Sequence, residues 1–545
     1  MDDSPEPSQN DDPSNSPEPV LLALPEVITI DPRGDILLDV TFETSRSTLK
    51  AARKATPKPR PGQRDPPPPL PVLKPHIRLA YRVDLATLKK HSRYFTNLLG
   101  DTRFQEARAI AQRLDEIAAR GQNPGDLAPE DLPRVEIEDD DEATRTAGRE
   151  TAFADMLRVL HGLPTVTKPV TVLYVTTLAV LADRFACTAP VSRHLIAVLK
   201  FRWPTTPPLR PREDGLSGLT LAAEELVRQK VLVAWLLEQA PRLAAATKEL
   251  VLFGSHRWSV AYEDDEDDGG ADAGRGAAHA RQDAVWWFLP DGLEEELHYR
   301  RHQILRSLAS IPAHFLHLYT TRTRNGYRQC KLGYDSSSAC DSFQLGEMVR
   351  FLVSKNLLFL TNFAPSSLDE VKDFAAVDVG SILGALKQCP NYQVDRHHTN
   401  CGLRTRVMPI LEYVAAMLGT TAAQIGLQGW KRERRTTSWQ KPDDHNDDNA
   451  ARGASRKKDF VVEDSMGDGG GGGGRGTNGG RVFYFTRSVA SDQRLRFEGA
   501  MAADRLAREL FTADAWDWTP EDVDRVDQIS ESKHLSMPLR RKERK

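Results

Sequence analysis

Three short stretches in the first third of the chain have the hydrophobic pattern of β-strands. Residues 34–42 form an apolar, β-branched run bounded by a turn signal, and apolar residues largely alternate with others in 77–83 and 134–138. Alternation with a period of two puts successive side chains on opposite faces of a strand. The pattern predicts three strands, and we expect the first two to pair as a hairpin across the proline-rich segment between them.

Apolar residues at helical spacing dominate the rest of the ordered sequence. The first such stretch predicts one helix through Asp84 to Leu99, and Asp84 stands where its carboxylate can cap the start. Gly162 follows a short apolar helix and suits a left-handed C-terminal cap, whereas Pro241 is expected to break the stretch 221–252. Further helices are predicted in 153–160, 170–185 and 191–201, and in the segment that resumes at residue 284.

Clusters of proline, glycine and charged residues separate these patterned segments from segments that cannot form a packed core. We therefore predict an α+β protein with a mainly helical second domain and disordered tails. The expected order is a disordered leader (1–30), an α+β domain (31–200) with a disordered proline-rich insertion (46–75), a helical extension (215–260), a linker (261–283), a helical cysteine-containing domain (284–426), a disordered linker (427–480) and a mostly disordered tail with short ordered patches (481–545).

Composition excludes several classes of protein. The formal net charge of −4 gives no general attraction to nucleic acid or to a membrane surface, so neither is an expected partner. The longest apolar stretch, 170–181, is shorter than the ~20 residues of a membrane span, and residues 1–19 lack the features of a secretory signal. The odd count of five cysteines favours a reducing compartment. We expect an intracellular protein, and the basic clusters at 431–435, 456–458 and 540–545 leave nucleus and cytoplasm equally open.

The order of the predicted elements resembles the BTB/POZ fold, a protein-interaction domain. The likeness covers Asp31 to Leu199, and three motifs carry it: Asp39-Val40 in the first strand, Leu88-x3-Ser92-x2-Phe95-x2-Leu98 in the first helix, and Leu181-Ala182-Asp183-Arg184-Phe185-Ala186-Cys187 in a later helix. The chain departs from the family in its basic insertion, and in Arg82 near a position where many BTB domains have histidine. It looks like a divergent, fungal-type BTB protein, which implies self-association as a homodimer or the docking of a protein partner.

The resemblance also points to one candidate docking motif. BTB domains that recruit a cullin-type ubiquitin-ligase scaffold have a hydrophobic residue, followed two positions later by glutamate, after the first long helix. Phe104 and Glu106 match that pattern here. A substrate adaptor of a cullin ligase is therefore an alternative function.

Four of the five cysteines lie in one segment. Cys330 and Cys340 are ten residues apart, and Cys389 and Cys401 are twelve apart with His397 and His398 between them. Thiolate and imidazole are the ligands that zinc prefers, so we predict a structural zinc site formed by the four cysteines, with His397 or His398 as a substitute ligand. Zinc modules usually pair ligands two to four residues apart, and the alternative is four separate buried thiols.

No motif in the chain predicts catalysis. The P-loop, H-E-x-x-H and G-x-S-x-G patterns are absent, and the glycines of 469–480 lack the strand and helix of a dinucleotide-binding turn. We expect no catalytic or cofactor-binding residues and conclude that the protein is not an enzyme. The leading interpretation is an interaction module or adaptor, and the alternative from another class is a zinc-containing nuclear or chromatin-associated regulatory factor.

Overall fold

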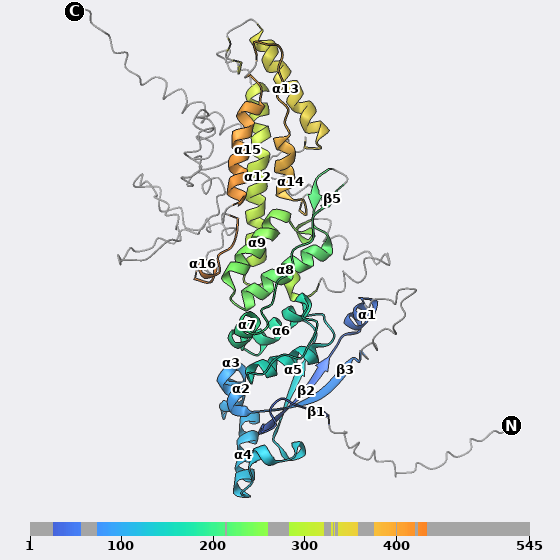
Figure 1. Ribbon diagram of the computed structural model, residues 1–545, viewed down its shortest axis with the longest axis vertical. Helices are drawn as coiled ribbons and strands as arrows, with labels where there is room; N and C mark the ends of the chain where they lie inside the picture. Colours follow the sequence, from blue (N-terminus) through green and yellow to red (C-terminus); the bar gives the residue numbers. More distant parts are fainter. Residues whose placement is uncertain are drawn as a thin grey trace, which may run out of the picture.

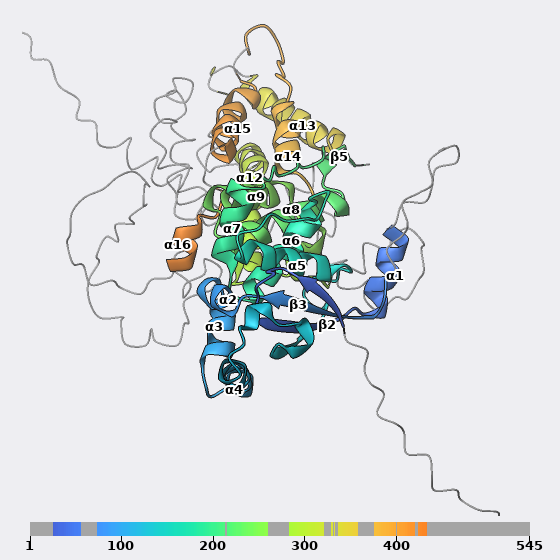
Figure 2. The same cartoon turned by 60° about the horizontal axis from the view of Figure 1, so that its bottom comes forward.

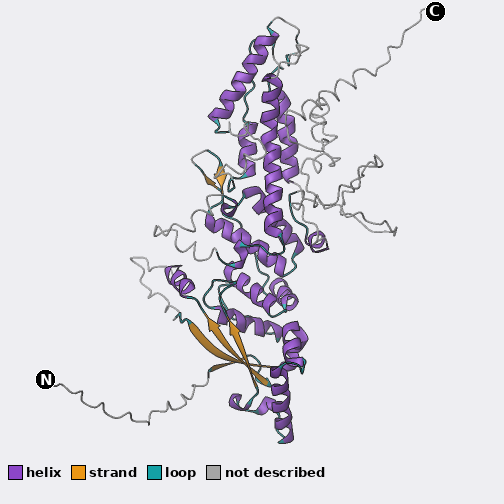
Figure 3. Ribbon diagram, turned by 180° about the vertical axis from the view of Figure 1, so that it is seen from behind, coloured by secondary structure: helices purple, strands orange, loops and turns teal. Residues whose placement is uncertain are grey.

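The computed structural model describes residues 25–55, 73–212, 215–259, 283–320, 329–330, 332, 336–357, 375–398, 401–419 and 423–432. These residues form a mixed α and β structure, with a small sheet toward one end and helices along the remainder (Figures 1 and 3). The prediction of an α+β protein with a mainly helical second part is confirmed at this level. The expected tail 481–545, the three basic clusters apart from Lys431 and Arg432, and most of the linkers at 261–283 and 427–480 lie outside the described residues.

The sheet has four strands in the order β1-β3-β2-β4. The predicted hairpin is confirmed, because β2 (Ile36–Glu43) runs antiparallel to β3 (His76–Val83). The predicted third strand is β4 (Arg134–Asp139), which pairs in parallel with β2. Alternate residues of β2 and β4, such as Val40 and Ile137, face the helices and are buried in the first hydrophobic core.

Two predictions of disorder are wrong at their edges. Residues 26–29 of the expected leader form β1 (Glu26–Thr29), which pairs in parallel with β3. The backbone of β1 finds its partners in a strand more than 50 residues later, which no local pattern indicates. The expected insertion begins with α1 (Arg46–Ala55), where Leu49 and Ala51 are buried; Figure 2 shows it beside the sheet. The remainder of the insertion, 56–72, lies outside the described residues.

Helices cover one face of the sheet and complete the first core. Their bounds are α2 (Leu85–His91), α3 (Arg93–Gly100), α4 (Gln105–Ala119), α5 (Arg149–Leu160), α6 (Val172–Arg184) and α7 (Thr188–Ala197), with short 3-10 turns at Pro124–Asp126 and Pro129–Asp131. The caps at Asp84 and Gly162 are confirmed, since Asp84 accepts from Thr87 N–H and Gly162 has φ 72°. The single helix predicted through Leu99 is wrong, because Ser92 ends α2 and caps α3 by accepting from Phe95 N–H.

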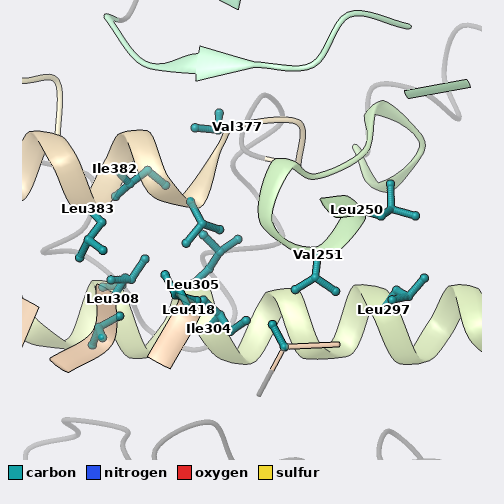
Figure 4. Packing of buried hydrophobic residues seen from close by; sticks show 14 of the residues in the cluster. Leu250, Val251, Leu297, Ile304, Leu305, Leu308, Val377, Ile382, Leu383 and Leu418 are labelled. Carbon is teal, nitrogen blue, oxygen red and sulfur yellow. The ribbon is translucent and has the colours of Figure 1, made fainter. Parts of the chain in front are cut away.

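A second core joins the remaining helices. These are α8 (Leu221–Leu236), α9 (Ala240–Phe253), α12 (Leu293–Thr320), α13 (Ser337–Ser354), α14 (Val379–Lys387), α15 (Arg404–Gly419) and α16 (Leu427–Arg432), together with the two-residue strands β5 (Arg210–Pro211) and β6 (Ser217–Gly218) and 3-10 turns at His256–Trp258 and Val285–Trp287. Figure 4 shows apolar side chains of α9, α12, α14 and α15 meeting in this core. The break expected at Pro241 is confirmed, whereas α16 lies in a segment predicted to be disordered and packs Leu427 into the core.

Helix α8 belongs to both cores. Val227 and Val231 contact the helical core, whereas Val233 and Leu237 pack against the core of the sheet region. Because successive apolar positions of one rigid helix serve two cores, the sheet region and the helical region are mechanically connected through α8. Among the described residues, no helix is both long enough and apolar enough to cross a membrane.

Candidate metal centre

Three cysteines and one histidine converge at the end of the helical region that lies far from the sheet (Figure 1). Cys330 lies in a short segment before α13, Cys340 lies in the first turns of α13, and His398 and Cys401 precede α15. One ligand atom from each of these four residues lies within 4.8 Å of the other three. Residues up to 71 positions apart in the sequence therefore form one compact donor set.

The distances within this set fit a tetrahedral zinc ion. Cys330 Sγ lies 3.6 Å from Cys401 Sγ, and His398 Nδ1 lies 3.5 Å from Cys330 Sγ and 3.6 Å from Cys401 Sγ. Tetrahedral bonds of about 2.3 Å to sulfur and about 2.0 Å to nitrogen separate two sulfurs by about 3.8 Å and a sulfur from a nitrogen by about 3.5 Å. The four side chains can hold a metal, and four protein ligands leave no open position for a substrate.

Neighbouring polar groups orient the donors. The far ring nitrogen of His398, Nε2, lies 3.2 Å from Ser336 Oγ and 3.8 Å from a carboxylate oxygen of Asp395, so Nδ1 is directed at the sulfurs. Asp395 also accepts from His398 N–H at 3.1 Å. The Asp341 carboxylate accepts from the backbone N–H groups of Gln329 and Cys330 at 2.8 Å each, which ties the Cys330 segment to α13. Such outer partners hold ligands in position before a metal binds.

Burial and neighbouring groups shift the pKa values of two of the thiols in opposite directions. Burial opposes ionisation of Cys330, but hydrogen bonds from Leu332 N–H and from neighbouring side chains hold its pKa at about 7, below the ordinary value of 9.0. Burial, together with the charges of Cys401 and Cys330, raises the pKa of Cys340 to about 12. A divalent cation offsets this repulsion and allows all three sulfurs to bind as thiolates.

The structure places the other predicted ligands outside the cluster. Cys389 is 1% exposed and packs in the helical core, where burial raises its pKa to about 11. It continues the apolar face of α14, seven positions after Ile382 and three after Leu386, and this helical spacing was a sequence signal for a buried thiol. His397 is exposed. Of the predicted set, Cys330, Cys340, Cys401 and the substitute His398 come together.

Sequence reasoning missed Ser336, Asp341 and Asp395. Asp341 directly follows Cys340, and Asp395 precedes His398 by three residues, so proximity to the ligands was the available signal. The predicted partner-binding residues Phe104 and Glu106 lie far from this centre, at the start of α4 near the opposite end of the molecule (Figure 1). Phe104 is 43% exposed, and Glu106 is also exposed.

Comparison with known proteins assigns no relative. No family model matches the chain, and neither the curated proteins nor the solved structures contain a match to it. The geometry of the chain's own residues therefore carries the functional argument.

Proposed function

We propose that the protein is a non-catalytic interaction module: a BTB-like α/β region that self-associates or docks a protein partner, joined to a helical region that a structural zinc ion holds together. The strand arrangement carries the first half of this proposal. An antiparallel β2–β3 hairpin with β4 parallel to β2, followed by α5, α6 and α7, is the order of elements that the BTB resemblance implies.

Contacts between the resemblance motifs support the same reading. Ser92 Oγ donates to the carbonyl of Phe185 at 2.7 Å, and the rings of Phe95 and Phe185 stack with centroids 5.6 Å apart. The resemblance motif that includes Ser92 and Phe95 therefore contacts the motif that includes Phe185. Asp39 of the first-strand motif is buried and paired with Arg78 through bonds of 2.9 and 2.8 Å, and Arg82 donates instead to backbone carbonyls, including that of Gly34 at 3.0 Å.

Self-association is tested by the molar mass of the purified full chain. Light scattering coupled to gel filtration should give twice the chain mass of 60.8 kDa, in a concentration-dependent equilibrium with the monomer. A strictly monomeric protein at all concentrations up to 100-fold above the working range would remove self-association and leave only docking of a different partner.

The zinc half of the proposal rests on the match between the donor distances and tetrahedral geometry. Bound zinc would supply cross-linking of three chain segments, and the ligand set would leave it no catalytic position. Protein purified without chelator should contain about one zinc ion per chain by atomic emission. Cys401→Ala should reduce this stoichiometry to near zero, whereas Cys389→Ala, a control outside the cluster, should retain the metal.

The cullin-adaptor alternative is favoured by one observation, the 43% exposure of Phe104 at the start of α4. An exposed phenylalanine followed by an exposed glutamate can dock without rearrangement of the chain. Calorimetry against the N-terminal region of a cullin scaffold tests it: binding should disappear in Phe104→Ala and Glu106→Lys and persist in Gln112→Ala. Absence of heat with the wild-type chain removes this alternative.

The regulatory-factor alternative shares the zinc site and differs in its partner. A chromatin-associated protein would be retained on DNA at low salt and released as salt increases, because phosphate contacts release counterions. The net charge of −4 favours a protein partner instead. Retention on DNA that falls steeply with salt would reverse this preference.

A further inference from the structure

The three thiols of the metal centre differ in access to solvent. Cys340 is 0% exposed on α13 and Cys330 is 5% exposed, whereas Cys401 is only partly buried. Cys401 is therefore the cysteine of the cluster with the greatest access to solvent. Its sulfur lies 3.6 Å from that of Cys330, and both cysteines lie in non-helical segments.

We propose that Cys401 is an oxidation site for hydrogen peroxide or a small organic hydroperoxide, and that Cys330 resolves the oxidised sulfur as a disulfide and thereby ejects the metal. The inference rests on the proposed zinc site. It adds a covalent modification and a regulatory input to a centre whose resting role is structural.

The chemistry balances with a peroxide as the oxidant. The thiolate of Cys401 attacks one peroxide oxygen, the O–O bond breaks, and a sulfenic acid and a hydroxide ion form. The thiolate of Cys330 then attacks Cys401 Sγ, the S–O bond breaks, and a second hydroxide leaves. Two thiolates, one hydrogen peroxide and two protons give one disulfide and two water molecules, so the sulfurs lose two electrons and the peroxide gains them.

Geometry selects Cys330 as the resolving partner. A disulfide requires the sulfurs to approach to about 2.05 Å, so the pair must close by about 1.5 Å. Segments outside regular secondary structure can make this movement, whereas Cys340 is held by the backbone of α13. Removing two of four ligands leaves only Cys340 and His398, a pair that cannot retain zinc with comparable affinity.

The consequence is a loss of cross-links at one end of the helical region. The new disulfide still joins the Cys330 segment to the segment before α15, but the metal bonds to Cys340 on α13 are gone. Oxidation therefore removes the metal cross-link to the first turns of α13, while Met348, Phe351 and Leu352 of this helix remain packed in the helical core.

The experiment uses the zinc-loaded full-length chain. Hydrogen peroxide is added in portions of one molar equivalent per chain, and released zinc is followed with a metallochromic chelator. The remaining thiols are then alkylated before peptide mass spectrometry. We expect one zinc ion released per peroxide consumed, a Cys330–Cys401 disulfide as the main cross-link, and recovery of zinc binding after a dithiol reductant and zinc are added.

Two variants sharpen the result. Cys401→His retains a four-ligand set but lacks the exposed thiol, so peroxide-driven zinc release should slow at least 10-fold. Cys389→Ala should behave as the wild type. If the histidine variant does not bind zinc, the disulfide map of the wild type still decides the question.

The outcomes separate the two proposals. Protein that never contains zinc contradicts the structural-zinc proposal, and the disulfide map then tests the cysteine pair alone. Protein that contains zinc but retains it under peroxide, or that forms its main disulfide through Cys340, overturns this inference and leaves the zinc site intact.

Discussion

The sheet region and the helical region each bury an arginine almost completely, and these two arginines differ in the position of their carboxylate partners. In the sheet region, Arg149 is paired with Asp139, ten residues earlier, at 2.8 Å. In the helical region, Arg228 is fully buried between Glu224 on its own helix and Glu294, 66 residues later, at 2.9 and 2.8 Å. The Arg149–Asp139 ion pair is nearly local, although Arg149 also donates to the carbonyl of Glu43, 106 residues earlier. The Arg228–Glu294 ion pair exists only after two distant segments have met.

The two cores also differ in what their aromatic rings contact. The sheet region packs aromatic rings against each other: Phe153 contacts Phe42, Tyr81 and Phe185 with centroids 5.2 to 5.7 Å apart. In the helical core the Trp287 ring instead lies under the guanidinium of Arg228, 5.2 Å from its centroid. Leucine, isoleucine and valine predominate in both cores, and the thiol cluster lies at the far end of the helical region. Two polar clusters of the helical region, Arg228 with Glu294 and the cysteine–histidine cluster, join remote segments, and changes at these residues test how far the two regions are independent.

The largest expected effect comes from removing metal. Dialysis against a strong chelator should lower the amide-exchange protection of α13 and α15 by at least about 100-fold, because about 3 kcal/mol or more of binding free energy is lost with the ion. Protection of β2, β3 and α5 should change by less than about 3-fold. Hydrogen-exchange mass spectrometry measures both regions in one sample. Uniform loss of protection would show that the two regions unfold as one unit.

Breaking the buried ion network comes next. Arg228→Met should lower the free energy of unfolding by about 3–5 kcal/mol, because it leaves the carboxylates of Glu224 and Glu294 without their cation. Arg149→Met removes one paired charge from the sheet region and should lower the free energy of unfolding by less than Arg228→Met does. Arg113→Met, at an exposed pair on α4, is the control and should cost below about 1 kcal/mol. Denaturant unfolding followed by tryptophan fluorescence gives the values, and equal losses in all three variants would contradict the difference described here.

Acid should weaken the helical region through Glu224. Burial alone would raise the pKa of this carboxyl, but hydrogen bonding to His256 and the charge of Arg228 hold it at about 2, below the ordinary 4.5. A depressed folded-state pKa means that the unfolded chain binds the proton more tightly, so the stabilisation is complete above pH 4.5 and is lost as the pH falls toward 2. The contribution is on the order of 3 kcal/mol.

Glu224→Gln tests the origin of that pH dependence. The variant should be less stable at pH 7 and should lose less stability than the wild type between pH 5 and pH 2.5. Thermal midpoints across this range provide the measurement, and Glu116→Gln on exposed α4 provides the control. If the thermal midpoint of Glu224→Gln falls with pH as steeply as that of the wild type, the acid sensitivity comes from other carboxyl groups.

The smallest effect separates the two faces of α8. Val231 and Val233 are both 0% exposed on one helix, but Val231 contacts the helical core and Val233 the core of the sheet region. Each change to alanine should cost about 2 kcal/mol through the lost methyl groups and the cavity. Hydrogen exchange should report the loss mainly in α9 and α12 for Val231→Ala, and in α5 and α6 for Val233→Ala. Identical exchange maps would mean that α8 transmits either defect through the whole chain.

Features that depend on neighbouring residues could be predicted from the amino-acid pattern alone. An apolar, β-branched run and two alternating stretches predicted the β2–β3 hairpin and β4. An aspartate just before one helical pattern and a glycine just after another predicted the caps at Asp84 and Gly162. The density of cysteine and histidine between residues 330 and 401 also identified the segment that contains the candidate metal ligands.

Tertiary structure alone decided which residues meet. It selected Cys330, Cys340, Cys401 and His398, and it placed Cys389 in the hydrophobic core. It also paired β1 with a strand more than 50 residues away, and it brought Glu294 to Arg228 across 66 positions. Periodicity states which side of an element is buried, but not which distant element covers it. Such long-range pairings form only in a fold that buries the apolar faces of all the elements at the same time.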